Sequence, residues 1–276
     1  MAAGFLSEIL QKRIPRVEPS DQAFYPSQGC MVGECSMARY REFRYRGDDV
    51  LGSITAISSP NDDLAKLFAG HKGPIVNKWH HYFPIYTRYF DQFRNRPTRF
   101  LEIGVSKGGS LEIWRKYLGP DAVIFGIDID PACAKFDGLA GQVRIGSQDD
   151  PDFLNKVVDE MGGIDVVLDD GSHHMDHIPI TLETLFPRLA ENGVYMIEDL
   201  HASYWPKFGG GLTEEGNFFN YLRRIADVMH RNYLHEEVRF GRDADYDHIS
   251  GLHIYDSIAV LEKAQPFMPR YSKIGS

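Results

Sequence analysis

The stretch VVLDDGSHHMDH, residues 166–177, gathers groups that could do chemistry at the end of an apolar run. Two adjacent aspartates follow the run, and three histidines come within the next seven residues. A solvated turn rich in Asp, Gly and Ser is the ordinary explanation of such a stretch. Clustered carboxylates and imidazoles can also hold a metal ion or supply a general base. Which explanation applies depends on the elements around the stretch.

Short apolar runs alternate with helical patterns from Arg99 onward. The runs are RFLEIGV, AVIFGIDID, QVRIG, IDVVLDD and GVYMIEDL, and the helical patterns are SLEIWRKYL, DPDFLNKVVDEM and IPITLETLFPRLAEN. Because the runs are continuously apolar, we expect strands buried on both faces, in a parallel sheet between helices. The later segment HISGLHIYDSIAVLEKA predicts an antiparallel hairpin. The sequence therefore predicts an α/β fold with a doubly wound, mostly parallel sheet and an antiparallel C-terminal strand.

Composition limits the partners and the compartment. The 276 residues carry a net charge of -9 with a pI near 5.6, which argues against nucleic acid as a partner. No apolar run approaches the ~20 residues needed to cross a bilayer, and the first residues lack a signal-peptide pattern. Three scattered cysteines, Cys30, Cys35 and Cys133, predict free thiols and a reducing cytoplasm. Residues 1–70 are rich in Pro, Gly, Ser and Arg and predict an N-terminal extension before a domain at 71–276.

The segment LEIGVSKGGSLEIW, residues 101–114, predicts a cofactor site, since ligands of doubly wound sheets bind at the carboxyl ends of strands. Gly104 and Gly109 would allow a tight turn, and Ser110 would cap the following helix. The loop departs from the G-x-G-x-x-G pattern of dinucleotide sites. Glu102 would attract an ammonium group, and Asp128 would accept hydrogen bonds from ribose hydroxyls. A nucleoside with a cationic amino-acid tail is expected, and S-adenosylmethionine fits that description.

Three further residues are predicted to touch the same cofactor. Ser147 and Gln148, in GSQDD, are placed to hydrogen-bond the adenine, with simple turn chemistry as the alternative. Asp169 would face the methionine end of the cofactor.

Asp170, Glu198 and Asp199 end two strands that are expected to be neighbours. Three unpaired carboxylates at one place would repel one another, and a divalent cation would remove that repulsion. A set of oxygen ligands suits Mg²⁺ better than zinc. Salt bridges to Arg or Lys are the alternative, which the scarcity of basic residues in these segments disfavours. His173 lies three residues beyond Asp170, and imidazole is a workable general base near neutral pH.

Rival functions use the same residues. His173, His177 and Asp170 could form the two-histidine, one-carboxylate site of a non-haem iron hydroxylase, but Glu198 and Asp199 would then lack a role. A catechol-like small-molecule O-methyltransferase and a non-enzymatic S-adenosylmethionine-binding scaffold are further alternatives. His174 and His177 are otherwise interpreted as structural.

These segments, together with NKWHHYFPIY and GVYMIEDLHASYW, resemble the metal-dependent sugar O-methyltransferases of the macrocin and mycinamicin type over about residues 75–262. The resemblance implies a seven-stranded class I Rossmann-like fold, Mg²⁺ ligands at Asp170, Glu198 and Asp199, and a base at His173. It also implies a homo-oligomer that methylates a sugar of a glycosylated natural product, as in antibiotic biosynthesis, or of a saccharide. The arginine- and aromatic-rich segment 37–46 is expected to form an interface or a lid.

Aromatic and polar residues of two segments are predicted to line the acceptor side of the cleft. The predicted acceptor residues are Lys78, His81, Tyr86, Tyr204 and Trp205. Gly209–Gly211 follow the second group and predict a mobile loop over the acceptor.

Overall fold

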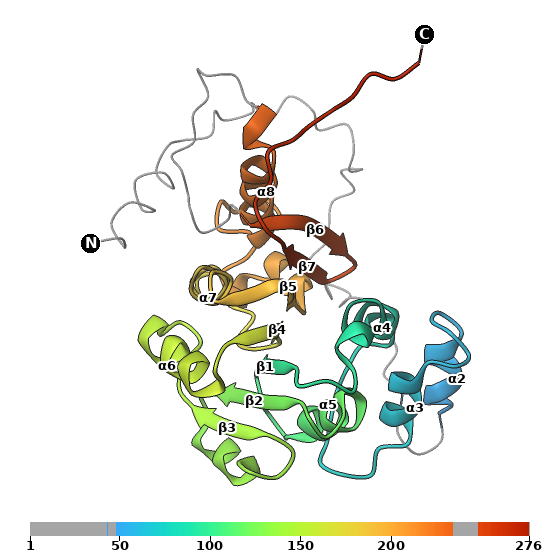
Figure 1. The fold of residues 1–276 in the computed structure, drawn as a ribbon. Coiled ribbons are helices and arrows are strands. Elements are labelled where there is room, and N and C mark those ends of the chain that lie inside the picture. Colours follow the sequence, from blue (N-terminus) through green and yellow to red (C-terminus); the bar gives the residue numbers. More distant parts are fainter. Residues whose placement is uncertain (1–42, 44–47, 234–247, 276) are drawn as a thin grey trace, which may run out of the picture. The chain divides into compact units, whose positions relative to one another are not determined.

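Seven strands form a single mixed sheet in the computed structural model of the chain (Figure 1). The strands are β1 (Arg99–Ile103), β2 (Val123–Asp128), β3 (Gln142–Ile145), β4 (Ile164–Asp169), β5 (Leu189–Ile197), β6 (Ile249–Tyr255) and β7 (Ile258–Lys263). Their order is β3-β2-β1-β4-β5-β7-β6. The strands β1 to β5 run parallel, whereas β7 is antiparallel to both β5 and β6. The predicted doubly wound sheet with an antiparallel C-terminal strand is confirmed.

The structure describes residues 43, 48–233 and 248–275. Its α-helices are α2 (Val50–Thr55), α3 (Asp63–Ala69), α4 (Phe83–Phe90), α5 (Gly109–Leu118), α6 (Pro151–Met161), α7 (His177–Leu185) and α8 (Phe218–Met229). The 3-10 turns are η2 (His80–Tyr82), η3 (Asp91–Phe93), η4 (Pro131–Phe136), η5 (Leu200–Tyr204), η6 (Pro206–Phe208) and η7 (Arg231–Tyr233). Within these ranges no helix combines the length and the apolar character that crossing a membrane requires.

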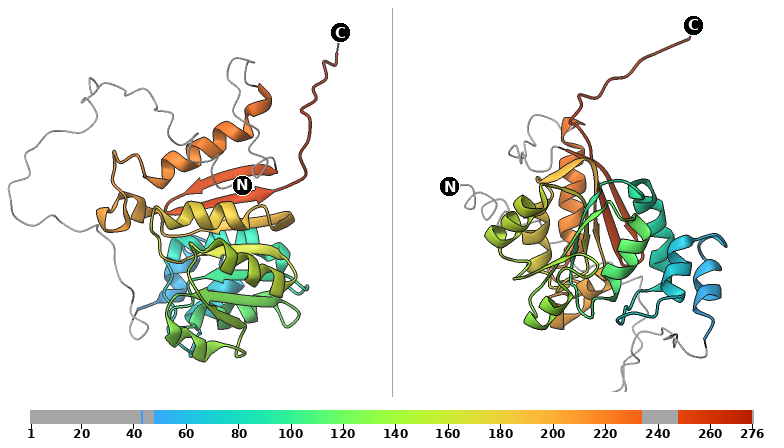
Figure 2. Two further views of the ribbon diagram at one scale, coloured as in Figure 1. Left: turned by 90° about the vertical axis from the view of Figure 1, so that its left-hand side faces the viewer. Right: turned by 60° about the horizontal axis from the view of Figure 1, so that its bottom comes forward.

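The helices cover the sheet in two layers (Figure 2, right). One apolar core joins α3, α4 and α5 to one face of the sheet and contains Phe90, Phe100 and Trp114. The other core joins α6, α7 and α8 to the opposite face and contains Leu154 and Leu182. Burial of each such side chain stabilises the fold by about 1.5–3 kcal/mol, so both cores hold the strands firmly.

The register of the strands determines where the residues that follow β1, β4 and β5 lie. Ile103 at the end of β1 pairs with Asp169 of β4, which in turn pairs with Ile197 of β5. The three strands therefore end at the same level, and the residues that follow them emerge side by side.

The helix starts follow local chemistry that the sequence only partly predicts. In α6, the Asp150 carboxylate accepts hydrogen bonds from the N–H groups of Asp152 and Phe153, as a capping residue does. In α5 the capping position belongs to Gly108, which has a φ of 79°. Ser110 lies one residue inside the helix, so its predicted capping role is wrong.

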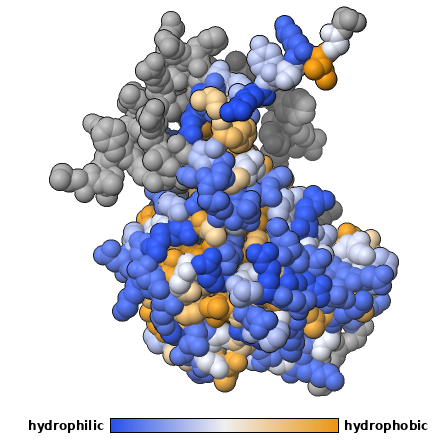
Figure 3. Space-filling view, viewed as in Figure 1, coloured by the Kyte–Doolittle hydropathy of each residue, from blue (hydrophilic) through white to orange (hydrophobic). Residues whose placement is uncertain are grey.

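The part of the predicted extension that the structure describes packs against the rest of the domain. Ile54 of α2 and Leu64 of α3 belong to the same apolar core as α4 and α5. The segment 37–46 lies outside the described residues except for Phe43, so its role stays a prediction. Cys30 and Cys35 also lie outside them, and Cys133 is a buried free thiol. The face in Figure 3 is mostly hydrophilic, with small groups of apolar residues between.

Candidate active site

A cavity of about 430 Å³ opens at the carboxyl ends of β1 to β4. This volume is in the range of small-molecule and cofactor sites. Its polar lining residues include Asn77, Lys78, Ser106, Ser110, Asp128 and Asp170. The cavity thus lies where a doubly wound sheet binds its ligands.

Gly104 and Gly109 permit close approach between parts of the chain itself. Gly104 has a φ of 94°, and a Cβ there would lie 2.0 Å from the backbone oxygen of Asp170. A Cβ on Gly109 would lie 2.3 Å from the backbone oxygen of Pro74. Gly104 therefore lets two backbone segments touch at the cavity wall, and Gly109 lets the start of α5 touch the segment that carries the lining residue Ile75.

Asp128 lines the cavity from the end of β2. Its Oδ2 accepts hydrogen bonds from the N–H groups of Val105 (3.0 Å) and Ser106 (2.8 Å), and its Oδ1 accepts one from Asp130 N–H (2.8 Å). These bonds fix the carboxylate in place. Oδ1 keeps a lone pair for a ligand hydroxyl.

Glu102 does not face the cavity as predicted. Its side chain is fully buried, and its carboxylate accepts hydrogen bonds from the Ser110 hydroxyl (2.8 Å) and the Trp114 indole N–H (3.1 Å). Burial raises the pKa of Glu102 to about 7, against the opposing charge of Lys78. Glu102 can therefore act on a ligand only through Ser110, which does line the cavity.

Asp169 and Gln148 are also engaged inside the protein. Asp169 is buried, is not part of the cavity lining, and accepts hydrogen bonds from Gln148 Nε2 (3.2 Å) and the Tyr195 hydroxyl (3.3 Å), so its carboxylate points into the interior and its contact with the methionine end stays a prediction. Burial raises the pKa of Asp169 to about 7. Gln148 Nε2 also donates to the Thr181 hydroxyl (3.0 Å), and Gln148 Oε1 accepts a bond from Ser172 N–H (2.5 Å), so both amide protons are used and one lone pair of Oε1 remains.

The predicted adenine contacts change accordingly. Gln148 and Ser147 both line the cavity, as expected. However, the Ser147 hydroxyl donates to Asp149, which is the turn chemistry considered as its alternative. The side chains of both residues thus line the cavity while bonded within the protein, and their contact with the adenine stays a prediction.

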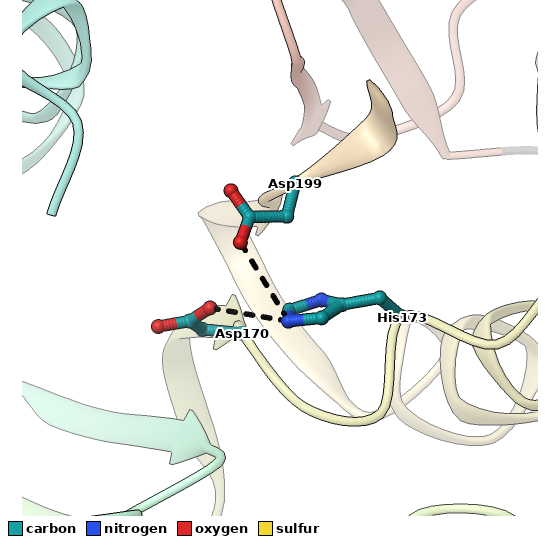
Figure 4. Close-up of side chains that lie close together, drawn as sticks. All are labelled: Asp170, His173 and Asp199. Atoms are coloured by element: carbon teal, nitrogen blue, oxygen red, sulfur yellow. Dashed lines mark ion pairs between the residues drawn. The ribbon is translucent and has the colours of Figure 1, made fainter. Parts of the chain in front are cut away.

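Asp170, His173 and Asp199 converge at the opposite end of the cavity (Figure 4). His173 Nε2 lies 3.8 Å from Asp170 Oδ1 and 3.6 Å from Asp199 Oδ2. One ligand atom of each residue lies within 4.8 Å of the others, a spacing that a metal ion can bridge. His173 and Asp199 have φ values of 56° and 54°, a region that non-glycine residues occupy at a cost of about 1–3 kcal/mol. Strain of this kind often marks functional sites.

Glu198 is the third carboxylate at this place, and Asp170, Glu198 and Asp199 are together called the acidic group. The Glu198 side chain is bonded on the side away from the cavity. It is buried, and its Oε1 accepts a hydrogen bond from the Tyr86 hydroxyl. Lys78 Nζ lies 2.9 Å from Glu198 Oε2 and 2.5 Å from Asp170 Oδ2. Burial raises the pKa of Glu198, which the nearby Lys78 ammonium opposes.

The salt bridge to Lys78 is the alternative that the sequence disfavoured. The strand ends themselves contain few basic residues, but Lys78 reaches them from a segment 92 positions earlier in the chain. Burial alone would lower the pKa of Lys78, and the carboxylates of Asp170 and Glu198 reverse that shift and raise it. The ammonium is therefore a charged member of the site. Its place in NKWHHYFPIY was the only sequence signal.

Tyr82 also contacts this site, and the sequence did not single it out. Its hydroxyl donates a hydrogen bond of 2.7 Å to Asp199 Oδ1. This leaves Asp199 Oδ2 facing His173.

The residues predicted to line the acceptor side of the cleft do not share one location in the structure. Tyr86 is buried behind Glu198 and does not line the cleft, because its hydroxyl binds that carboxylate. His81 contacts the Trp79 and Tyr82 rings, and its buried Nε2 has no hydrogen-bond partner in the described part of the chain. Tyr204 stacks on Phe219 of α8.

The predicted loop over the acceptor is folded and anchored. It contains η5 and η6, and Asn217 Nδ2 donates hydrogen bonds of 2.9 Å to the backbone oxygens of Ser203 and Gly211. Trp205 contacts the rings of His201 and Phe208, and Phe208 contacts His173. The aromatic rings of this loop therefore form a row that ends at His173, beside the acidic group.

His177 does not join the acidic group in the described structure, so the geometry does not support the iron site. Its Nδ1 lies 3.0 Å from Ser172 Oγ, and its Nε2 lies 3.6 Å from Asp149. His174 lies beside Asp176, as expected of a structural residue.

The sheet order, the carboxylate at the end of β2 and the acidic group beyond β4 and β5 together define a class I Rossmann-like methyltransferase fold. Residues 101–200 match the family model described as a methyltransferase domain, and the chain carries a domain of that family.

The resemblance to sugar O-methyltransferases is also confirmed. The chain is 34% identical over 260 residues to the 8-demethyl-8-(2-methoxy-alpha-L-rhamnosyl)-tetracenomycin-C 3'-O-methyltransferase of Streptomyces olivaceus, covering 91% of this chain and 65% of that protein. It is 32% identical over 222 residues to the mycinamicin VI 2''-O-methyltransferase of Micromonospora griseorubida, covering 77% and 55%. The chain thus spans about half to two thirds of the length of these relatives.

A solved structure shares the fold. The MycE methyltransferase of the mycinamycin biosynthetic pathway, in complex with Mg, SAH (S-adenosylhomocysteine) and mycinamycin VI, matches with a TM-score of 0.66 and 32% identity. The match covers 76% of this chain and 56% of that one.

The buried Glu102 predicts a measurable pH dependence of stability. Its pKa is about 7 in the folded chain against an ordinary 4.5, so the folded state holds a proton that the unfolded state releases between these values. Stability from this group is full below pH 4.5 and is lost as the pH rises through 7. Glu102→Gln imitates the protonated acid and should reduce the loss between pH 5 and 8 by up to about 3 kcal/mol.

Urea unfolding at the two pH values measures this difference. Glu112→Gln, on the neighbouring helix α5, is the control for removing one carboxylate. An unchanged pH dependence in Glu102→Gln would show that Glu102 is ionised in the folded chain.

Proposed function

We propose that the chain transfers a methyl group from S-adenosylmethionine to a hydroxyl of a sugar, with Mg²⁺ held at the acidic group. The observation that carries this proposal is the single cavity with Asp128 at one end and Asp170, His173 and Asp199 at the other. Asp128 suits the ribose of the methyl donor, and the acidic group suits the acceptor hydroxyl. The sugar as acceptor rests on the relatives, whose names describe methylation of glycosylated compounds.

The residues present fit Mg²⁺. Asp170 and Asp199 offer hard carboxylate oxygens close to one another. Glu198 is bonded to Tyr86 and Lys78 and lies outside this cluster of ligand atoms, so its role as a third ligand stays a prediction. Such a cation lowers the pKa of a coordinated hydroxyl and orients it.

His173 is proposed to take the proton. Its Nε2 faces both carboxylates, which stabilise the imidazolium that forms. The acceptor oxygen forms a bond to the methyl carbon as the sulfur–carbon bond breaks, and the hydroxyl proton passes to Nε2. The products are a methyl ether, S-adenosylhomocysteine and a protonated His173. Asp170 and Asp199 also hold the ring in position, which supplies the proximity that the reaction needs.

The aromatic row is proposed to hold the acceptor. Trp79, His201, Trp205 and Phe208 follow one another at ring distances of 4.7 to 6.0 Å and end at His173. Faces of aromatic rings suit the C–H surfaces of sugars. Lys207 lies over the rings of Trp205 and Phe208, so an acceptor on that face must displace it.

A screen of glycosylated and plain phenolic acceptors with a radiolabelled methyl donor tests the function. We expect label in the glycosides, and calorimetry should show binding of S-adenosylhomocysteine and not of NAD. Label in catechols alone would favour the small-molecule alternative. Binding of NAD in place of S-adenosylhomocysteine would contradict the proposal altogether.

His173→Ala tests the proposed base. Loss of a general base should lower kcat by about 10²- to 10⁴-fold, while S-adenosylhomocysteine binding is retained. His174→Ala, at the next position, is the matched control and should keep kcat within a few fold. A near-normal kcat for His173→Ala across pH 6 to 9 would place the base elsewhere.

A further inference from the structure

Lys78 connects two carboxylates that come from different strands. Its side chain is 5% exposed, and its Nζ lies 2.5 Å from Asp170 Oδ2 after β4 and 2.9 Å from Glu198 Oε2 after β5. In the described part of the chain it is the only lysine or arginine that pairs with the acidic group. The ring of Tyr86, 5.9 Å from Nζ, closes the site from behind.

The position of Lys78 is fixed by its own segment. His71 Nε2 lies 2.8 Å from the backbone oxygen of Pro74, and Pro74 and Ile75 pass directly against Gly109 of α5. Immediately after Lys78 the chain enters η2 and α4, which carry Tyr82 and Tyr86 to the acidic group. One segment thus supplies both the ammonium and two hydroxyl donors.

The Lys78 ammonium changes the net charge of the acidic group. With the three carboxylates ionised, the site without Lys78 has a formal charge of minus three, and with Lys78 it has minus two. Burying unpaired like charges is costly, and an ammonium at hydrogen-bond distance offsets that cost. The same ammonium also repels any cation that binds the same carboxylates.

We propose that Lys78 is the internal counter-ion of the acidic group and sets its affinity for a divalent cation. In the absence of the cation, Lys78 holds Asp170 and Glu198 together and keeps the site assembled. When the cation binds, Lys78 shares these carboxylates with it and lowers its affinity. Lys78 is therefore a positioning residue, and this proposal rests on the Mg²⁺ site of the proposed function.

Calorimetric titration of Mg²⁺ into the metal-free full chain tests the proposal. Lys78→Met removes the charge and should bind Mg²⁺ at least about tenfold more tightly than the unmodified chain, because the repulsion is gone. Without metal, Lys78→Met should melt at a lower temperature, and Mg²⁺ should raise its melting temperature more than that of the unmodified chain. A merely structural role would predict the opposite change in affinity.

Three further variants test whether the effect on Mg²⁺ affinity comes from the charge of Lys78. Lys78→Arg keeps the charge and should keep an affinity near that of the unmodified chain. Lys107→Met removes an exposed lysine that lines the same cavity and should change the affinity little. If Lys78→Met fails to fold, Lys78→Gln, which can still hydrogen-bond, carries the same expectation of tighter binding.

The possible outcomes separate the two proposals. Unchanged or weaker Mg²⁺ binding in the neutral variants would overturn the role of Lys78 and leave the Mg²⁺ site standing. Binding only in the neutral variants would support the role of Lys78 and contradict Mg²⁺ dependence of the natural chain. Binding in neither would overturn both.

Discussion

Repulsion among three carboxylates is the constraint on which the site depends. Asp170, Glu198 and Asp199 meet because β4 and β5 end at the same level, and a partly buried set of like charges is unstable unless something compensates it. The chain compensates from behind, with the Lys78 ammonium and the hydroxyls of Tyr82 and Tyr86. The oxygens of Asp170 and Asp199 that face His173 are left toward the cavity.

The carboxylates come from the sheet, but the groups that compensate their charge come from an element outside it. The strands β4 and β5 supply the carboxylates, while the segment from Lys78 into α4 supplies the ammonium and the hydroxyls that stabilise them. Gly104 allows β1 to lie against the backbone of Asp170, so the donor cavity and the acidic group share one wall. The methyl donor and the acceptor are thereby proposed to meet across a short distance fixed by backbone contacts.

Much of the fold and the centre of the site could be predicted from the sequence. Continuous apolar runs identify buried parallel strands, and residues that follow neighbouring strands must lie close together, as Asp170 and Asp199 do. The direction of side chains was harder to predict. Glu102 and Asp169 were expected in the cavity, but Trp114 and Tyr195 draw them into the interior. Lys78 is 92 positions from its partner Asp170, and no local pattern reveals a contact of that range.

We propose that methyl transfer by this chain needs a divalent cation at the acidic group. Transfer of labelled methyl to an active glycoside, measured after exhaustive chelation and again as Mg²⁺ is restored, tests it most directly. We expect transfer to vanish with the chelator and to return with Mg²⁺, and we expect no such return in Asp170→Asn. Full transfer by the chelated protein would contradict it.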